Sequence, residues 1–130
     1  MQFQLFTDYA IRILIHLHTH EDLQTATEIA ESVGVSYPVF VKVANQMKKK
    51  GLLCSVQGRY GGYRLGRSAH KISLYDVVSA IEGGLAINRC LRDDRYCSRH
   101  ATEHCPVHDN FQNLQNMLIE HLSGQYISDF

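Results

Sequence analysis

The chain has 130 residues, 45% of them hydrophobic, and its 13 basic residues balance 13 acidic ones. This is enough for one compact domain with a modest core. No apolar run approaches the roughly 20 residues that span a bilayer, and no signal-peptide pattern opens the chain. We therefore expect a cytoplasmic protein without a membrane partner, in which thiols stay reduced.

The charge is unevenly distributed along the chain. Residues 1–70 carry eight basic and five acidic side chains, a net charge of +3, whereas residues 71–130 carry a net charge of −3. A basic first half is a mild indication of a phosphate-bearing partner.

The first predicted element is a helix, because apolar residues recur at three- and four-residue spacing. The histidines near its end are interpreted as a polar helix terminus, where cations are favourable; a metal site from His16 and His20 is the less favoured alternative. The apolar face consists of Phe3, Phe6, Ala10, Ile13, Leu14 and Leu17.

Two short helices joined by a glycine turn follow. Thr25 to Glu28 is a capping-box pattern that opens the first of them, and Gly34 ends it in a left-handed conformation. Ser36 and Pro38 begin the next helix, which runs to about Lys50. This order predicts a helix-turn-helix, whose second helix enters the major groove of DNA.

A β-hairpin is predicted directly after the second helix. Leu52 to Val56 and Tyr63 to Leu65 read as its strands, and a glycine-rich turn with Arg59 joins them. Such a wing can bring an arginine to a phosphate or to the minor groove, although a plain structural hairpin explains the pattern equally well. The expected fold is mainly α with a small β-hairpin wing, that is, a winged helix-turn-helix.

The candidate DNA-binding residues lie on the second helix and the wing. Asparagine and glutamine can pair with adenine, while lysines more often meet phosphates or simply end a helix in solvent. The candidates are Ser36, Tyr37, Lys42, Asn45, Gln46, Lys49, Arg59 and Tyr60.

A fourth helix, opened by Ser73 and Asp76, runs to about Glu82, and a last helix begins at Pro106. The last helix carries a near-heptad apolar stripe, and we favour a second copy of the chain as its partner over the first helix of its own domain. The domain plan is therefore a DNA-binding domain over residues 1–84, a loop over 85–106 and a dimerisation helix with its tail over 107–130. The stripe consists of Val107, Phe111, Leu114, Leu118 and Leu122.

Three cysteines, Cys90, Cys97 and Cys105, lie in the loop before the last helix. Thiolates gathered in a chain that lacks a secretion signal are most simply interpreted as ligands of a soft metal or an iron–sulfur cluster. The sequence thus predicts a sensor attached to a DNA-binding module. Cys54, in the first hairpin strand, is interpreted as a buried small side chain.

The cysteine-bearing loop has two alternative interpretations, and an enzyme is a third possibility for the chain as a whole. Tetrahedral zinc could be bound by nitrogen and sulfur donors. A metal-free thiol sensor could form a disulfide between Cys90 and either of the other two cysteines. An enzyme is not expected, since no nucleophile–base pair or phosphate-binding loop stands out. The candidate zinc donors are Cys97, His100, His104, Cys105 and His108.

Taken together, these motifs resemble the Rrf-two (Rrf2) family of winged helix-turn-helix regulators, over nearly the whole chain. The matching segments are residues 6–10 in the first helix, 41–47 in the second helix of the helix-turn-helix, 61–65 in the wing, and the three cysteines. The resemblance implies a homodimeric transcriptional regulator, in the main a repressor, that binds a double-stranded operator. It also implies a [2Fe–2S] or [4Fe–4S] cluster that senses nitric oxide, redox state or iron, and that we expect to be lost from protein prepared in air.

The resemblance implies Cys90, Cys97 and Cys105 as three cluster ligands. For the fourth, the NsrR-like branch implies Asp8 of the partner subunit and the IscR-like branch implies His108; the chain resembles the NsrR-like branch more closely. Two features depart from the family pattern: six residues separate Cys90 from Cys97, and Gln57 stands where relatives usually carry arginine.

Overall fold

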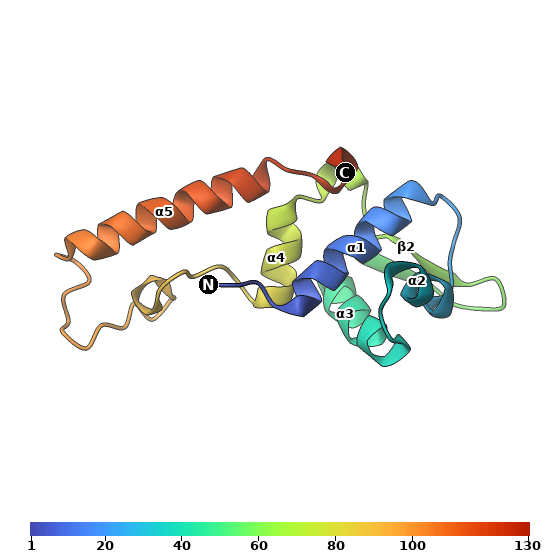
Figure 1. The fold of residues 1–130 in the computed structure, drawn as a ribbon, viewed down its shortest axis with the longest axis horizontal. Helices are drawn as coiled ribbons and strands as arrows, with labels where there is room; N and C mark the ends of the chain where they lie inside the picture. Colours follow the sequence, from blue (N-terminus) through green and yellow to red (C-terminus); the bar gives the residue numbers. More distant parts are fainter.

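The computed structural model describes all of residues 1–130. The chain forms a head and a long arm (Figure 1). The head (residues 5–82) packs four helices around one core and carries the hairpin on one side. The arm consists of the cysteine loop (residues 83–105) and the last helix. The helices are α1 (Leu5–Thr19), α2 (Ala26–Val33), α3 (Tyr37–Lys49), α4 (Leu74–Glu82) and α5 (Pro106–Ser123).

The helix-turn-helix has the local signals that the sequence predicted. The Thr25 hydroxyl accepts from the backbone N–H of Glu28, and the Glu28 carboxylate accepts from the backbone N–H of Thr25. Gly34 ends α2 with φ of 73°, a conformation that glycine adopts without steric cost. Ser36 occupies the N-cap position of α3 but makes no side-chain cap hydrogen bond, so Pro38 in the first turn is the stronger local signal.

The core lies where α1, α2, α3 and α4 meet. Phe40 of α3 is fully buried, and the Tyr63 ring packs against its ring edge-to-face with centroids 5.2 Å apart. The predicted apolar face of α1 is correct except for Phe3, which precedes the helix and is 42% exposed. Other fully enclosed core residues include Ala10, Ile13, Leu14, Ile29, Val43, Ala44, Met47, Ile72 and Val77.

The wing is a two-stranded antiparallel hairpin of β1 (Leu53–Val56) and β2 (Gly62–Leu65). Its register pairs Leu53 with Leu65 and Val56 with Gly62. Leu53 is buried against the core, whereas the turn at residues 57–60 is exposed. The hairpin is thus rooted in the head and free at its tip.

The chain returns to the head after α5. The backbone N–H of Ile127, in the turn η3 (Ile127–Asp129), donates to the carbonyl of Ile72, and that of Leu74 donates to the carbonyl of Gln125. Ile127 is fully buried. The C-terminal end of α5 is therefore fixed to the head, while its N-terminal end extends away beside the cysteine loop (Figure 1).

Helix α5 leaves much of its apolar surface uncovered. It packs on α4 and on the turn η2 (Arg89–Leu91). Leu122 is buried, but Val107 and Leu114 of the predicted stripe are at least half exposed, and so is the neighbouring Met117. No helix of the chain is long and apolar enough to cross a bilayer.

Candidate functional site

Three cysteines and a histidine line one surface pocket of about 300 Å³. Cys90 lies in the η2 turn, Cys97 lies further along the cysteine loop, and Cys105 and His108 lie at the N-terminal end of α5. All three thiols are free and half-buried. The fold therefore places four of the five candidate cluster ligands in the lining of one pocket.

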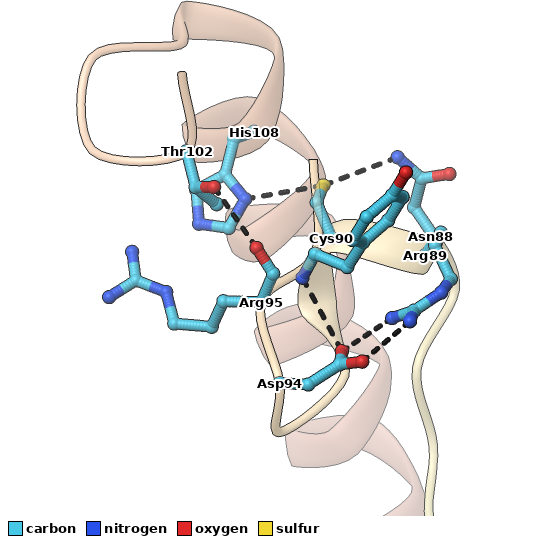
Figure 2. A network of polar contacts seen from close by, with 8 residues as sticks. Asn88, Arg89, Cys90, Asp94, Arg95, Thr102 and His108 are labelled. Carbon is cyan, nitrogen blue, oxygen red and sulfur yellow. Dashed lines mark hydrogen bonds and ion pairs between the residues drawn. The ribbon is translucent and has the colours of Figure 1, made fainter. Parts of the chain in front are cut away.

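His108 is the most enclosed of the four donors, with 8% of its surface exposed. Its Nδ1 lies 3.3 Å from the Sγ of Cys90, and the Asn88 amide donates to the same sulfur over 3.4 Å (Figure 2). The backbone N–H of His108 donates to the Sγ of Cys105 over 3.5 Å, so Cys105 is also the N-cap of α5. The backbone N–H and the ring of His108 thus both contact cysteine sulfur atoms, so the first turn of α5 forms part of the pocket wall.

Cys97 has an environment that favours its thiolate form. Backbone N–H groups of Ala101 and Arg99, followed by the positive charge of Arg99 and the N–H of His100, lower the pKa of Cys97 against the opposing effect of burial. The thiolate is the form of cysteine that binds metals. The contacts of the loop thus favour the thiolate form of Cys97.

An ion pair fixes the middle of the cysteine loop. Arg89 donates two hydrogen bonds of 2.5 Å to Asp94 (Figure 2). The Arg89 guanidinium also lies 5.0 Å from the centre of the Tyr96 ring. Asp94 lies at the surface, yet the hydrogen bonds from Arg89 lower its pKa to about 2. The Thr102 hydroxyl donates to the carbonyl of Arg95 over 3.1 Å and closes a second turn. The cysteine loop therefore has defined internal contacts.

The candidate donors of the alternative zinc site do not converge on one point. No three His, Cys, Asp or Glu side chains are arranged to hold one metal ion. His100 and His104 are exposed and line a neighbouring hollow of about 400 Å³ with Cys97, whereas Cys105 and His108 line the first pocket. Tetrahedral zinc, with Zn–S bonds of about 2.3 Å, requires sulfur ligands within about 3.8 Å of one another.

Asp8 lies outside the pocket within one subunit. It is on the exposed side of α1, where its Oδ2 accepts from Arg12 over 2.5 Å. Arg12 also donates to the carbonyl of Val33, at the end of α2, over 3.4 Å. Asp8 therefore does not line the cysteine pocket of its own subunit, and its ion-pair partner Arg12 contacts the end of α2.

The candidate DNA-binding residues form an exposed surface on α3 and the wing, with one exception. Gln46 is half-buried, and its Oε1 is enclosed without a hydrogen-bond partner. Tyr60 at the wing tip is 83% exposed, and the Arg59 guanidinium lies 5.7 Å from the centre of its ring. The exposed candidates are Ser36, Tyr37, Lys42, Asn45, Lys49, Arg59 and Tyr60.

The family model of Rrf2, described as an iron-dependent transcriptional regulator, matches residues 3–130. The chain belongs to the Rrf2 family. It is accordingly a DNA-binding transcriptional regulator and not an enzyme, as predicted.

Solved Rrf2 structures share the fold. CymR, the global cysteine regulator of B. subtilis, is 19% identical with a TM-score of 0.80 and covers 99% of this chain and 95% of its own. IscR of T. potens is 22% identical with a TM-score of 0.77, and the match covers 99% of this chain and 85% of the IscR chain. The oxidised form of CymR from Staphylococcus aureus is 19% identical with a TM-score of 0.72, and the match covers 98% of this chain and 93% of that CymR chain. The predicted winged helix-turn-helix fold is confirmed.

Sequence reasoning missed the two polar residues that attach the cysteine loop. Glu82 accepts hydrogen bonds from the backbone N–H and side-chain amide of Gln4 and from the hydroxyl of Thr7. Gln115, buried within α5, accepts from the backbone N–H of Ile87 over 3.0 Å. A signal existed for Glu82, since an acidic residue in the last turn of a helix opposes the helix dipole and therefore calls for a specific partner.

Proposed function

We propose that this Rrf2 protein is a cytoplasmic, homodimeric repressor whose cysteine loop holds an iron–sulfur cluster, and that the cluster sets its affinity for an operator. The observation that carries the proposal is the common pocket of Cys90, Cys97, Cys105 and His108. The family description as iron-dependent supports it. A bound cluster would supply sensitivity to nitric oxide, redox state and iron supply.

The donor set of the pocket fits such a cluster. Three half-buried cysteines supply the thiolates, and the backbone N–H groups around Cys97 lower its pKa and favour the coordinating form. The ligands of a cluster are distributed over several irons, so they need not converge on one point as zinc ligands do. The arrangement therefore supports a [2Fe–2S] or [4Fe–4S] cluster over a single zinc ion.

Two residues compete for the fourth ligand position. His108 is favoured by its burial beside Cys90 within the same subunit. Asp8 of the partner subunit is favoured by the resemblance to the NsrR-like branch. We assign the position to His108 and test it with H108A and D8A: the spectrum of the loaded protein should change in H108A and be unchanged in D8A. The reverse result would assign the position to Asp8.

DNA recognition is assigned to α3 and the wing. In a dimer joined through the uncovered face of α5, two heads would meet half-sites about one helical turn, roughly 34 Å, apart. Because α5 begins at the pocket and ends fixed to the head, a change in the loop can alter the spacing of the two α3 helices. A small change in that spacing is expected to cost much operator affinity.

The test begins with protein reconstituted with iron and sulfide without air. Visible absorption should appear in the wild type and in C54A, whose cysteine lies in the wing, and should be lost in C97A. Duplexes selected from a random DNA library by the loaded wild type then serve as the operator. Their affinity should fall after treatment with nitric oxide.

Equal affinity before and after nitric oxide would refute cluster control, and a colourless wild type would refute the cluster itself. Affinity lost on oxidation of a colourless protein, with a mass change of two hydrogens, would instead support the thiol–disulfide alternative. Metal analysis of the same colourless protein would reveal zinc.

A further inference from the structure

The end of α1 contains a histidine arrangement that the cysteine pocket does not involve. The rings of His16 and His20 stack with centroids 4.1 Å apart, and the Nδ1 of His20 lies 2.8 Å from the carbonyl of His16. The Nε2 of His16 lies 2.6 Å from the Oε1 of Gln24, in a half-buried position. Instead of ending the helix in solvent, His16 is directed to the segment that follows it.

Gln24 in turn holds one strand of the wing. Its carbonyl accepts from the backbone N–H of Tyr63 over 2.8 Å, and the two residues form an antiparallel bridge beside β2. The approach is so close that a Cβ at Gly62 would collide with the backbone of Gln24. Gln24 therefore acts as a one-residue third strand on the outer edge of the hairpin.

The same strand also contacts the helix assigned to the major groove. The Tyr63 ring packs on Phe40 of α3, so β2 is held between Gln24 on one side and α3 on the other. The turn that carries Arg59 extends beyond these contacts and is exposed. The root of the wing is the place where the direction of its tip is set.

We propose that His16, acting through Gln24, is a positioning residue that sets the angle of the wing relative to α3 and thereby places Arg59 on the operator. The proposal rests on the DNA contact of the wing in the proposed function and is independent of the cluster. The His16 side chain holds the Gln24 amide, and the backbone of Gln24 holds Tyr63. Loss of the first contact lets the wing pivot about its base.

A double-mutant cycle tests this inference. H16A, R59A and the double variant are compared with the wild type for affinity to the selected operator duplex, and all four proteins are reconstituted with iron and sulfide in the same way. H16A should weaken binding about tenfold, and the same change should have no further effect in the R59A background. H18A is the matched control, since His18 lies on the same helix with no hydrogen-bond partner, and it should bind as the wild type does. H16Q keeps a side-chain N–H donor and should restore most of the affinity.

The outcomes separate this inference from the proposed function. Two outcomes refute the positioning role. In the first, H16A weakens binding by the same factor whether Arg59 is present or replaced by alanine. In the second, R59A weakens binding but H16A does not. If R59A itself binds as the wild type does, the wing contact in the proposed function is refuted and the role of His16 with it. Should H16A fail to fold, Q24A takes its place in the cycle, because the backbone bridge to Tyr63 does not need the Gln24 side chain.

Discussion

Glu82 offers the sharpest test of how the cysteine loop is joined to the head. It is the last residue of α4 and immediately precedes the loop, and its carboxylate accepts hydrogen bonds at the start of α1 over 2.7 Å and 3.1 Å from Gln4 and 2.6 Å from Thr7. Gln4, the N-cap of α1, makes no cap hydrogen bond of its own. Glu82 therefore caps α1 from a position 78 residues away in the chain.

The expected cost of E82A follows from these contacts. Loss of an N-cap costs about 1 kcal/mol, and a buried polar group left without a partner costs about 1–3 kcal/mol. The Thr7 hydroxyl is such a group, since Thr7 is only 1% exposed. Because Glu82 itself is half-buried, we take values from the lower part of these ranges and expect E82A to lower the free energy of unfolding by about 2–3 kcal/mol. E82Q keeps one acceptor oxygen and should lose about 1 kcal/mol.

Urea unfolding at pH 7 and fixed protein concentration measures these losses. E120A is the matched control, because Glu120 is an exposed glutamate of α5 whose side chain makes no hydrogen bond, and it should change the free energy by less than about 0.5 kcal/mol. If E82A is as stable as E120A, Glu82 does not cap α1 and the reasoning is wrong.

The pH dependence gives a second measurement on Glu82. Partial burial opposes its charged form, but the hydrogen bonds from Thr7 and Gln4 outweigh burial and lower the pKa of Glu82 below 4.5. A carboxyl group whose pKa is lower in the folded chain stabilises that chain fully above the unfolded value and loses this effect as pH falls through the folded value. The advantage of the wild type over E82Q should therefore be constant from pH 7 to about 5.5 and shrink below 4.5. An advantage that grows on acidification would contradict the assignment.

Three further predictions concern the core, the wing and the arm. F40A should lower the free energy of unfolding by about 3–5 kcal/mol in urea melts, because Phe40 is fully enclosed; a loss below 1 kcal/mol would place it outside the core. G62A should cost about 1–3 kcal/mol, because its Cβ would meet the backbone of Gln24; wild-type stability would show that the bridge is loose. Replacement of Leu114 and Met117 together by lysine should convert a dimer to a monomer in light scattering, since both are at least half exposed on α5; an intact dimer would place the interface elsewhere.

The local signals in the sequence were sufficient for most of the fold. The capping box at Thr25, the left-handed Gly34 and the Ser73–Asp76 capping box all appear in the structure as predicted. Each depends on contacts within four residues, so these features can be predicted from the sequence without knowledge of the fold. The prediction that Phe3 belongs to the apolar face of the first helix is wrong, because apolar spacing alone does not mark the residue at which a helix begins.

Local sequence signals predicted only part of the candidate site. The cysteines and His108 were visible as donors, but nothing local says that His108 faces Cys90, 18 positions away. The pairing of Asp8 with Arg12 one helical turn later is a local contact, but the sequence spacing does not say that this pair lies on the exposed side of α1. Gln46 illustrates the same limit, since its polar side chain is enclosed by the packing of α3 against the head. Which side of a helix is covered depends on segments distant in sequence.

The amino-acid sequence by itself determined the order of helices and hairpin, the winged helix-turn-helix and the supply of sulfur and nitrogen donors. These follow from short-range geometry and residue chemistry. Only the tertiary structure decided which donors share a pocket, that Glu82 joins the loop to α1, and that the wing is held through Gln24. Such contacts form when residues far apart in the chain are brought together by burial of the common core, and that burial is a property of the whole fold.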